Sequence, residues 1–263
     1  MHVFIITDLE GISGVDIGGI LNEDSDIYKN ACVRLMEDTN AAIAGAFDGG
    51  ADKVTVVDGH HTGSNFIKEK LDKRAFQIPS KVSSAMNTEE FDMDVIFAVG
   101  AHAMAGNSEA FLDHTQDSVN WEDYRVNGKS YGEMGQQAIC FGLRDIPLVM
   151  MSGDEAACRE AEEMFPGVVT ACVKKALSRE KAVSVSPEES YRIIYEAAKE
   201  AVKKADTIKP YKITLPATVE VTFRTEEFCN KVYKESHGTE KNGRILTKRL
   251  DKITNYLDLA AFL

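Results

Sequence analysis

Two acidic residues stand directly after an apolar run near the start of the chain. The run covers residues 3–7, and Asp8 and Glu10 follow it, two residues apart. Side chains alternate across a strand, so both carboxylates point to the same side where the extended geometry continues. Because neighbouring like charges disfavour each other's ionised form, this pair indicates a bound cation.

Two later apolar runs end in a similar way. Residues 54–57 lead into His60, and residues 95–99 lead into His102. In an open α/β sheet, ligands bind beyond the carboxyl ends of the strands, so we expect these histidines beside the acidic pair. Carboxylates and imidazoles without thiolates suit zinc or manganese in hydrolytic sites. The three runs therefore predict a metal site at one edge of a sheet.

Each of these residues also has an ordinary structural role open to it. An Asp-x-Glu sequence after a strand can cap the following loop, and His102 can be a hydrogen-bonded core histidine. His60 is adjacent to His61, and the sequence alone leaves either one as the ligand. Asp58 stands two residues before His60 and is a candidate to orient its imidazole.

Two further candidates lie later in the chain. Glu133 falls in the first turn of an expected helix, where the helix dipole alone favours an acidic residue. Gly132 and Gly135 beside it permit a close approach to the backbone. His114 lies in the polar segment 112–116, where a solvated histidine is equally compatible with the sequence.

Composition narrows the class of protein. The chain has 263 residues, of which 44% are hydrophobic and 27% charged, as expected for a globular protein with one large or two smaller domains. The net charge of -12 argues against a nucleic-acid partner, which needs clustered Lys and Arg.

Cysteine usage and hydropathy bear on location. The five cysteines are odd in number and form no Cys-x-x-Cys pair, so we expect reduced thiols. No basic leader precedes the first apolar run, and no run approaches the ~18 apolar residues of a membrane span. We therefore expect a cytoplasmic protein without a membrane partner.

Strand and helix signals alternate through the first two-thirds of the chain, which predicts an α/β fold. The strand runs are apolar throughout, as in a largely parallel sheet flanked by helices on both faces. The expected elements of this part are a helix over 28–47 capped by Asp24 or Ser25, a hairpin strand over 119–126 with a turn at Asn127-Gly128, a helix over 132–141, a strand over 146–151, a helix over 155–164 capped by Asp154, and a strand over 168–173.

The pattern changes after residue 178. We predict a metal-binding catalytic α/β domain over 1–180 and a second, smaller α+β domain over 181–263. The expected elements of the second domain are a helix over 187–206 begun at Ser186-Pro187, a strand over 213–223 interrupted by Pro216, a strand over 245–247 and a terminal helix over 253–262.

Several motifs, in this order and spacing, resemble the zinc-dependent D-aminopeptidase family associated with bacterial dipeptide transport. The motifs are Asp8-Leu9-Glu10-Gly11-Ile12-Ser13-Gly14, Asp58-Gly59-His60, Gly100-Ala101-His102-Ala103, Gly132-Glu133-Met134-Gly135 and Gly153-Asp154. The resemblance implies two Zn²⁺ ions per subunit bridged by Asp8, and it implies that His114 is a catalytic residue and not a ligand. The implied ligands besides Asp8 are Glu10, His60, His102 and Glu133.

The resemblance also implies an activity and an assembly. We expect a metallo-aminopeptidase that hydrolyses the N-terminal residue from short peptides, including peptides that contain D-amino acids. We also expect a ring-shaped homo-oligomer that encloses its active sites, with a decamer as the candidate size.

Two alternatives remain at this point. In a haloacid-dehalogenase-like phosphatase, Asp8 would attack phosphate with the help of magnesium. However, Ile12 follows Gly11 and Cys158 stands four residues after Asp154, where that family has other residues, and both histidine motifs would be unused. The second alternative is a non-catalytic binding module stabilised by a metal, although structural zinc sites are usually closed and often contain cysteine.

Overall fold

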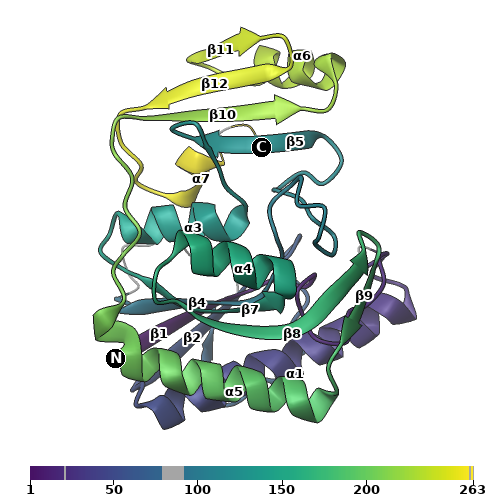
Figure 1. Ribbon diagram of the computed structural model, residues 1–263, viewed down its shortest axis with the longest axis vertical. Coiled ribbons are helices and arrows are strands. Elements are labelled where there is room, and N and C mark those ends of the chain that lie inside the picture. The colour runs from purple at the N-terminus through teal and green to yellow at the C-terminus, as the bar shows by residue number, and fades with distance from the viewer. Residues whose placement is uncertain (21, 79–91, 261, 263) are drawn as a thin grey trace.

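The computed structural model describes residues 1–20, 22–78, 92–260 and 262. Within them the strands form two sheets (Figure 1). Sheet A has seven strands in the order β3-β2-β1-β4-β7-β8-β9, and sheet B has five in the order β11-β12-β10-β5-β6.

Sheet A is parallel except at its last strand, β9, which pairs antiparallel with β8. Its strands are β1 (His2–Thr7), β2 (Lys53–Asp58), β3 (Phe76–Gln77), β4 (Val95–Ala101), β7 (Leu148–Asp154), β8 (Val169–Ser178) and β9 (Lys181–Ser184). In the register of β1, Thr7 lies opposite Asp58 of β2 and Val99 of β4. The three strands therefore end together, and the residues after them emerge at one edge.

Helices cover both faces of sheet A, as the apolar strands predicted (Figure 1). One face carries α1 (Asp26–Gly49) and α5 (Pro187–Lys204), and the other carries α3 (Glu133–Gly142) and α4 (Glu155–Met164). The backbones of α1 and α5 approach closely, because a Cβ at Gly45 would lie 2.2 Å from the carbonyl oxygen of Tyr195. The α/β fold with a largely parallel sheet is confirmed.

Local signals placed the longest helix correctly. The Ser25 side chain accepts a hydrogen bond from the Tyr28 amide at the start of α1, and Gly50 ends the helix with a φ of 112°. The predicted hairpin turn is also present, because Asn127 and Gly128 have φ values of 51° and 79°.

Sheet B is antiparallel, and it lies beyond α3 and α4 as seen from sheet A (Figure 1). Its strands are β5 (Trp121–Val126), β6 (Lys129–Ser130), β10 (Ala217–Phe223), β11 (Thr239–Asn242) and β12 (Ile245–Leu250). The remaining helices are α6 (Glu226–Glu235), α7 (Tyr256–Leu259) and the 3₁₀ helices η1 (Lys68–Lys70) and η2 (Ala205–Thr207). None of the described helices combines the length and the apolarity that crossing a bilayer requires.

The later part of the chain differs from the sequence-based expectation in several elements. Helix α6 and strand β11 were not predicted, β10 begins only after Pro216, and the terminal helix is limited to α7. The two sheets also do not separate at residue 180. Strands β5 and β6 come from before that point but lie in sheet B, whereas β9 and α5 come from after it and belong with sheet A. The division into domains over 1–180 and 181–263 therefore stays a prediction, and the two sheets do not divide at that boundary.

Candidate metal centre

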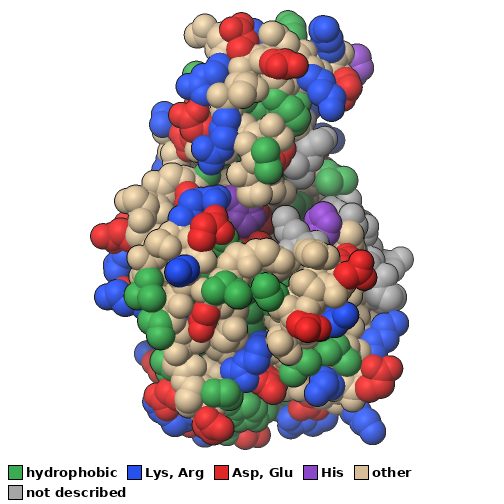
Figure 2. All heavy atoms as spheres, turned by 90° about the vertical axis from the view of Figure 1, so that its right-hand side faces the viewer, with side chains coloured by type: hydrophobic (Ala, Val, Ile, Leu, Met, Phe, Trp, Pro, Cys, Tyr) green, Lys and Arg blue, Asp and Glu red, His purple; other side chains and the backbone are tan. Residues whose placement is uncertain are grey.

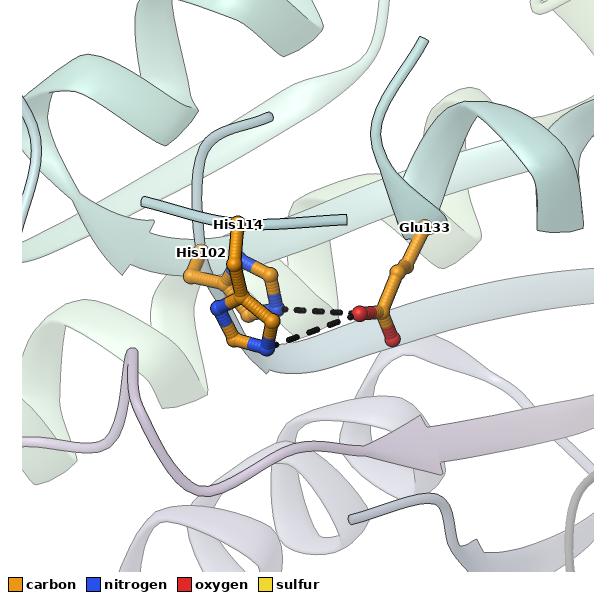
Figure 3. A group of neighbouring side chains, drawn as sticks. All are labelled: His102, His114 and Glu133. Atoms are coloured by element: carbon orange, nitrogen blue, oxygen red, sulfur yellow. Dashed lines mark ion pairs between the residues drawn. The ribbon is translucent and has the colours of Figure 1, made fainter. Parts of the chain in front are cut away.

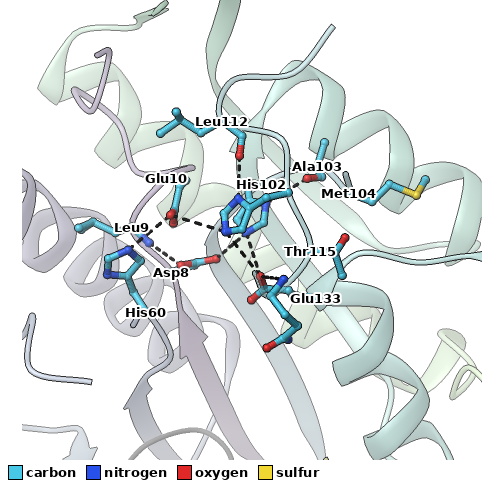
Figure 4. Close-up of polar contacts among 12 residues, drawn as sticks. Asp8, Leu9, Glu10, His60, His102, Ala103, Met104, Leu112, Thr115 and Glu133 are labelled. Carbon is cyan, nitrogen blue, oxygen red and sulfur yellow. Dashed lines mark hydrogen bonds and ion pairs between the residues drawn. The ribbon is translucent and has the colours of Figure 1, made fainter. Parts of the chain in front are cut away.

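The five predicted ligands and His114 lie together at the carboxyl edge of sheet A (Figure 4). Their donor atoms form two groups, each with all of its atoms within 4.8 Å of one another. The first group consists of Asp8, Glu10 and His60, and the second consists of His102, His114 and Glu133. Asp8 and Glu10 follow β1, His60 follows β2, and His102 follows β4. His114 lies in the loop after β4, and Glu133 is the first residue of α3.

The two groups touch each other. Asp8 Oδ2 lies 3.3 Å from His102 Nε2, and this contact joins them. Glu133 Oε1 lies 3.6 Å from both His102 Nε2 and His114 Nε2 (Figure 3). In the first group, Glu10 Oε1 lies 3.4 Å from His60 Nε2.

These separations fit a metal site better than a set of hydrogen bonds. Two ligand atoms that each lie about 2.0–2.2 Å from a tetrahedral zinc ion are about 3.3–3.6 Å apart. Glu10 Oε2 and His102 Nε2 are buried and have no hydrogen-bond partner within the described part of the chain. Because buried polar atoms are rarely left without a partner, these two atoms indicate a cation-binding site. The nitrogen and oxygen donors suit zinc.

The second ring nitrogen of each histidine is held from outside the site. His102 Nδ1 lies 3.0 Å from the carbonyl oxygen of Ala103, and His114 Nδ1 lies 2.8 Å from that of Leu112. Each contact assigns a proton to Nδ1 and leaves Nε2 as the nitrogen that can bind a metal ion. The two rings stack at a centroid distance of 3.9 Å.

Asp58 supports His60 through an intermediate residue. Asp58 accepts hydrogen bonds from the backbone amide and the side chain of Asn65, at 2.6 and 2.9 Å. Asn65 Oδ1 lies 3.4 Å from His60 Nδ1. The expected orienting role of Asp58 on the His60 imidazole therefore passes through Asn65. Asp58 itself accepts a hydrogen bond from the backbone amide of His60 and not from its ring.

His61 does not join either group. It is exposed, its φ is 48°, and its ring centroid lies 6.1 Å from that of His60. The structure therefore places His60 with the acidic pair and leaves His61 at the rim of the pocket.

The charges of the site are strongly coupled. Burial lowers the pKa of His60, but Glu10 and Asp8 outweigh this effect and raise it to about 9. Burial and the charge of Glu10 raise the pKa of Asp8 to about 6. Burial also raises the pKa of Glu133, but His102 and His114 outweigh it and lower the pKa to about 2. The carboxylates thus stabilise positive charge at the site. Protonated histidines supply this charge without metal, and a metal ion can supply it in place of their protons.

A buried lysine that was not predicted supports the loop after β1. Lys174 of β8 is 2% exposed, and its Nζ donates hydrogen bonds to the carbonyl oxygens of Glu10 at 2.8 Å and Val15 at 2.5 Å. Nζ also lies 5.0 Å from the centre of the Phe111 ring. Burial lowers the pKa of Lys174 to about 8, although nearby carboxylates act to raise it. The only signal in the sequence is a lysine directly after an apolar strand run.

Glu133 is also supported by a contact that was not predicted. The backbone amide of Gln116 donates to Glu133 Oε1 at 2.8 Å. The side chain of Gln116 is held by Gln136 and by the hydroxyl of Tyr256, which itself donates to Gln136 at 3.0 Å. Tyr256 begins α7, so a residue of the last helix contributes to the position of Glu133, a candidate metal ligand.

The site opens into a pocket of about 740 Å³. The acidic pair, Glu133, His60 and His114 line it, together with residues 179 and 180 between β8 and β9. Figure 2 shows histidine side chains at the hollow between the upper and lower parts of this face. The volume lies in the range of small-molecule sites.

Comparisons with known proteins identify the family. The family model "Peptidase_M55: D-aminopeptidase" matches residues 1–259. A D-aminopeptidase of Bacillus subtilis (strain 168) is 31% identical over 212 residues, which cover 80% of this chain and 77% of that protein. A solved structure, "Zn-dependent D-aminopeptidase DppA from Bacillus subtilis, a self-compartmentalizing protease", matches with a TM-score of 0.92 and 26% identity over 99% of this chain and 95% of that one. The chain therefore belongs to the D-aminopeptidase family, M55.

Proposed function

We propose that this protein is a zinc-dependent aminopeptidase that hydrolyses the N-terminal residue from short peptides, with two zinc ions per subunit. The observation that carries the proposal is the pair of donor groups joined by the 3.3 Å contact between Asp8 and His102. A phosphatase of the haloacid-dehalogenase type needs no such set of histidines, and the family match also favours the peptidase over a non-catalytic module.

In this proposal Asp8 would be shared by two sets of ligands. With Glu10 and His60 it would hold one ion, and with His102 and Glu133 it would hold the other. Three protein ligands for an ion would leave a position open to water or substrate, as in catalytic zinc sites. When bound, a zinc pair acidifies water to a nucleophile and polarises the scissile carbonyl group.

His114 is proposed as the residue that moves protons. The Leu112 carbonyl fixes the proton on Nδ1, so Nε2 is free to accept a proton and to pass it to the leaving amine. Its stacking on His102 fixes the plane of the ring. The pocket, the metal set and this imidazole together supply binding, a nucleophile and a proton carrier.

A second role for His114 has a specific observation in its favour. Its Nε2 lies within the same 4.8 Å group as the donor atoms of His102 and Glu133, as a ligand would. Replacing His114 with Gln separates the roles. We expect the folded variant to keep two zinc ions per chain and to lose about 100-fold or more in kcat. Loss of one zinc ion would instead make His114 a ligand.

The activity is tested on protein that has been stripped with a chelator and then resupplied with zinc. We expect metal-dependent release of p-nitroaniline from D-alanine p-nitroanilide and two zinc ions per chain by elemental analysis. L-alanine p-nitroanilide tests the preference for D residues, which we propose from the family and the named relatives. The absence of metal-dependent turnover on any substrate with a free amino terminus would overturn the proposal.

We also propose a ring-shaped homo-oligomer in the cytoplasm, with a decamer as the candidate size. The solved relative is described as self-compartmentalizing, and it matches 99% of this chain. All five cysteines are free, as in proteins of reducing compartments. Light scattering coupled to gel filtration tests the assembly, and a particle of the 29.0 kDa chain mass would contradict it.

A further inference from the structure

The charged residues that line the pocket are unevenly distributed. Among the described residues that line it, Arg179 is the one permanently charged cation. The acidic residues that line it are Asp8, Glu10, Asp117, Glu133 and Glu180. Bound metal ions would neutralise the three carboxylates of the metal set, but they leave the rim acidic. A free peptide carries an ammonium group at one end and a carboxylate at the other, and only Arg179 offers this carboxylate a fixed positive charge away from the metals.

Arg179 is held in place before any ligand binds. Its Nε donates to Asp113 Oδ1 at 2.8 Å, and its Nη2 donates to the carbonyl oxygen of Asp113 at 3.1 Å. The Leu112 amide donates to the carbonyl oxygen of Arg179 at 2.8 Å. These contacts fix Arg179 against the backbone of the residue that precedes His114. The guanidinium group is therefore held at a fixed place on the wall of the pocket.

The guanidinium group still has free donors. It carries five N–H bonds, of which Asp113 takes two and Glu180 takes one, through Nη1 at 2.9 Å. Two N–H bonds, one on each Nη nitrogen, have no partner among the described residues. The side chain is 46% exposed, whereas that of Asp113 is 11% exposed, so the free donors are accessible from the pocket. Paired N–H donors of this kind bind a carboxylate in a bidentate manner.

We propose that Arg179 binds the C-terminal carboxylate of the substrate and thereby selects dipeptides and tripeptides with a free C-terminus. This inference rests on the proposed aminopeptidase function and names the substrate class of the same site. An extended residue spans about 3.3–3.6 Å, so a peptide of two or three residues is about 7–11 Å long. Such a peptide fits a pocket of about 740 Å³ with its amino end at the metal set and its carboxylate at the rim.

The test compares two substrates that differ only in this group. The ratio of kcat/KM for D-Ala-D-Ala to kcat/KM for its C-terminal amide is measured for the wild type and for Arg179→Met. We expect the ratio to fall about tenfold or more in the variant, mainly through KM for the free acid. Arg192→Met is the matched control, because Arg192 lies on α5, is 62% exposed and pairs only with Glu189 among the described residues. Its ratio should equal that of the wild type.

Two further variants protect the test from a loss of folding. Arg179→Lys keeps one charge but loses the paired donors, so we expect a ratio between those of Met and Arg. Glu180→Gln removes the carboxylate that competes for Nη1, so the ratio should rise. An unchanged ratio in a folded Arg179→Met or Arg179→Lys enzyme that still cleaves the amide would overturn the inference and leave the proposed function intact. A wild-type enzyme that cleaves neither substrate would overturn both.

Discussion

His60 and His61 are chemically identical neighbours, yet only one of them lies in the site. His60 is 5% exposed and its Nε2 lies 3.4 Å from Glu10, whereas His61 is exposed and joins neither donor group. The sequence offers both residues as ligands and does not report which of them is buried. The residue types of the proposed metal set, by contrast, could be predicted, because each member lies shortly after an apolar strand or opens a helix.

The coupled charges of the site predict a pH dependence of zinc affinity. His60 has a pKa of about 9 and that of His102 is also raised, so both imidazoles carry protons at pH 7 in the metal-free protein. Zinc must displace these protons, so its apparent affinity should rise as the pH is raised from 6.5 to about 9. Each displaced proton contributes up to about a tenfold increase per pH unit.

Competition with a chromophoric chelator at several pH values measures this dependence. Calorimetry in buffers of different ionisation enthalpy counts the protons released on binding. A shallower slope is expected for His60→Gln, which has one fewer proton to lose. An affinity that does not change over this pH range would show that the imidazoles are already neutral.

At the scale of elements, strand β8 connects the core to the loop that carries the acidic pair. Lys174 donates from this strand to the carbonyl of Glu10 and also packs against Phe111, which leads into the His114 loop. One buried ammonium group thus contacts both the loop of the acidic pair and the segment that precedes His114. A lysine in a strand usually points to solvent, so its sequence alone could not predict this contact.

We predict that Lys174→Met weakens the metal site more than it weakens the fold. Methionine fills the space of the lysine stem, but the carbonyls of Glu10 and Val15 lose their donor, at a cost of about 1–3 kcal/mol for each buried group left unpaired. Relief from burying the ammonium group offsets part of this loss. Zinc affinity should fall about tenfold or more, and the melting temperature should drop.

Lys175→Met is the matched control for this variant. Lys175 is the next residue of the same strand, its side chain is 67% exposed, and it pairs with Glu155 at the surface. We expect its free energy of unfolding to change by less than about 0.5 kcal/mol. Its zinc affinity should equal that of the wild type. Equal zinc affinity in the Lys174 and Lys175 variants would show that the loop keeps its position without the buried lysine.

At the scale of the whole molecule, the arrangement of sheet B was the least predictable feature. Strand β10 pairs with β5, so Val219 lies opposite Val126, and the helices α3, α4 and α5 intervene along the chain. Hydrophobic periodicity reports which face of an element is buried, but not which distant strand completes the sheet. In parallel βαβ units, strands that are close in sequence are often neighbours in the sheet, so sheet A could be predicted. The boundary at residue 180 was placed without knowledge of the pairing between β5 and β10, and the two sheets do not follow it.

The C-terminal segment nevertheless reaches the metal site through Tyr256. Its hydroxyl group contacts Gln116 and Gln136, and the Gln116 amide donates to Glu133. Tyr256→Phe removes this hydroxyl without changing the ring, so Gln116 loses a partner and Glu133 is held less firmly. We expect kcat to fall about tenfold with little change in KM, because Tyr256 does not line the pocket. Tyr233→Phe on the exposed face of α6 controls for the loss of a tyrosine hydroxyl, and kcat equal to that of this control would mean that Glu133 is positioned without α7.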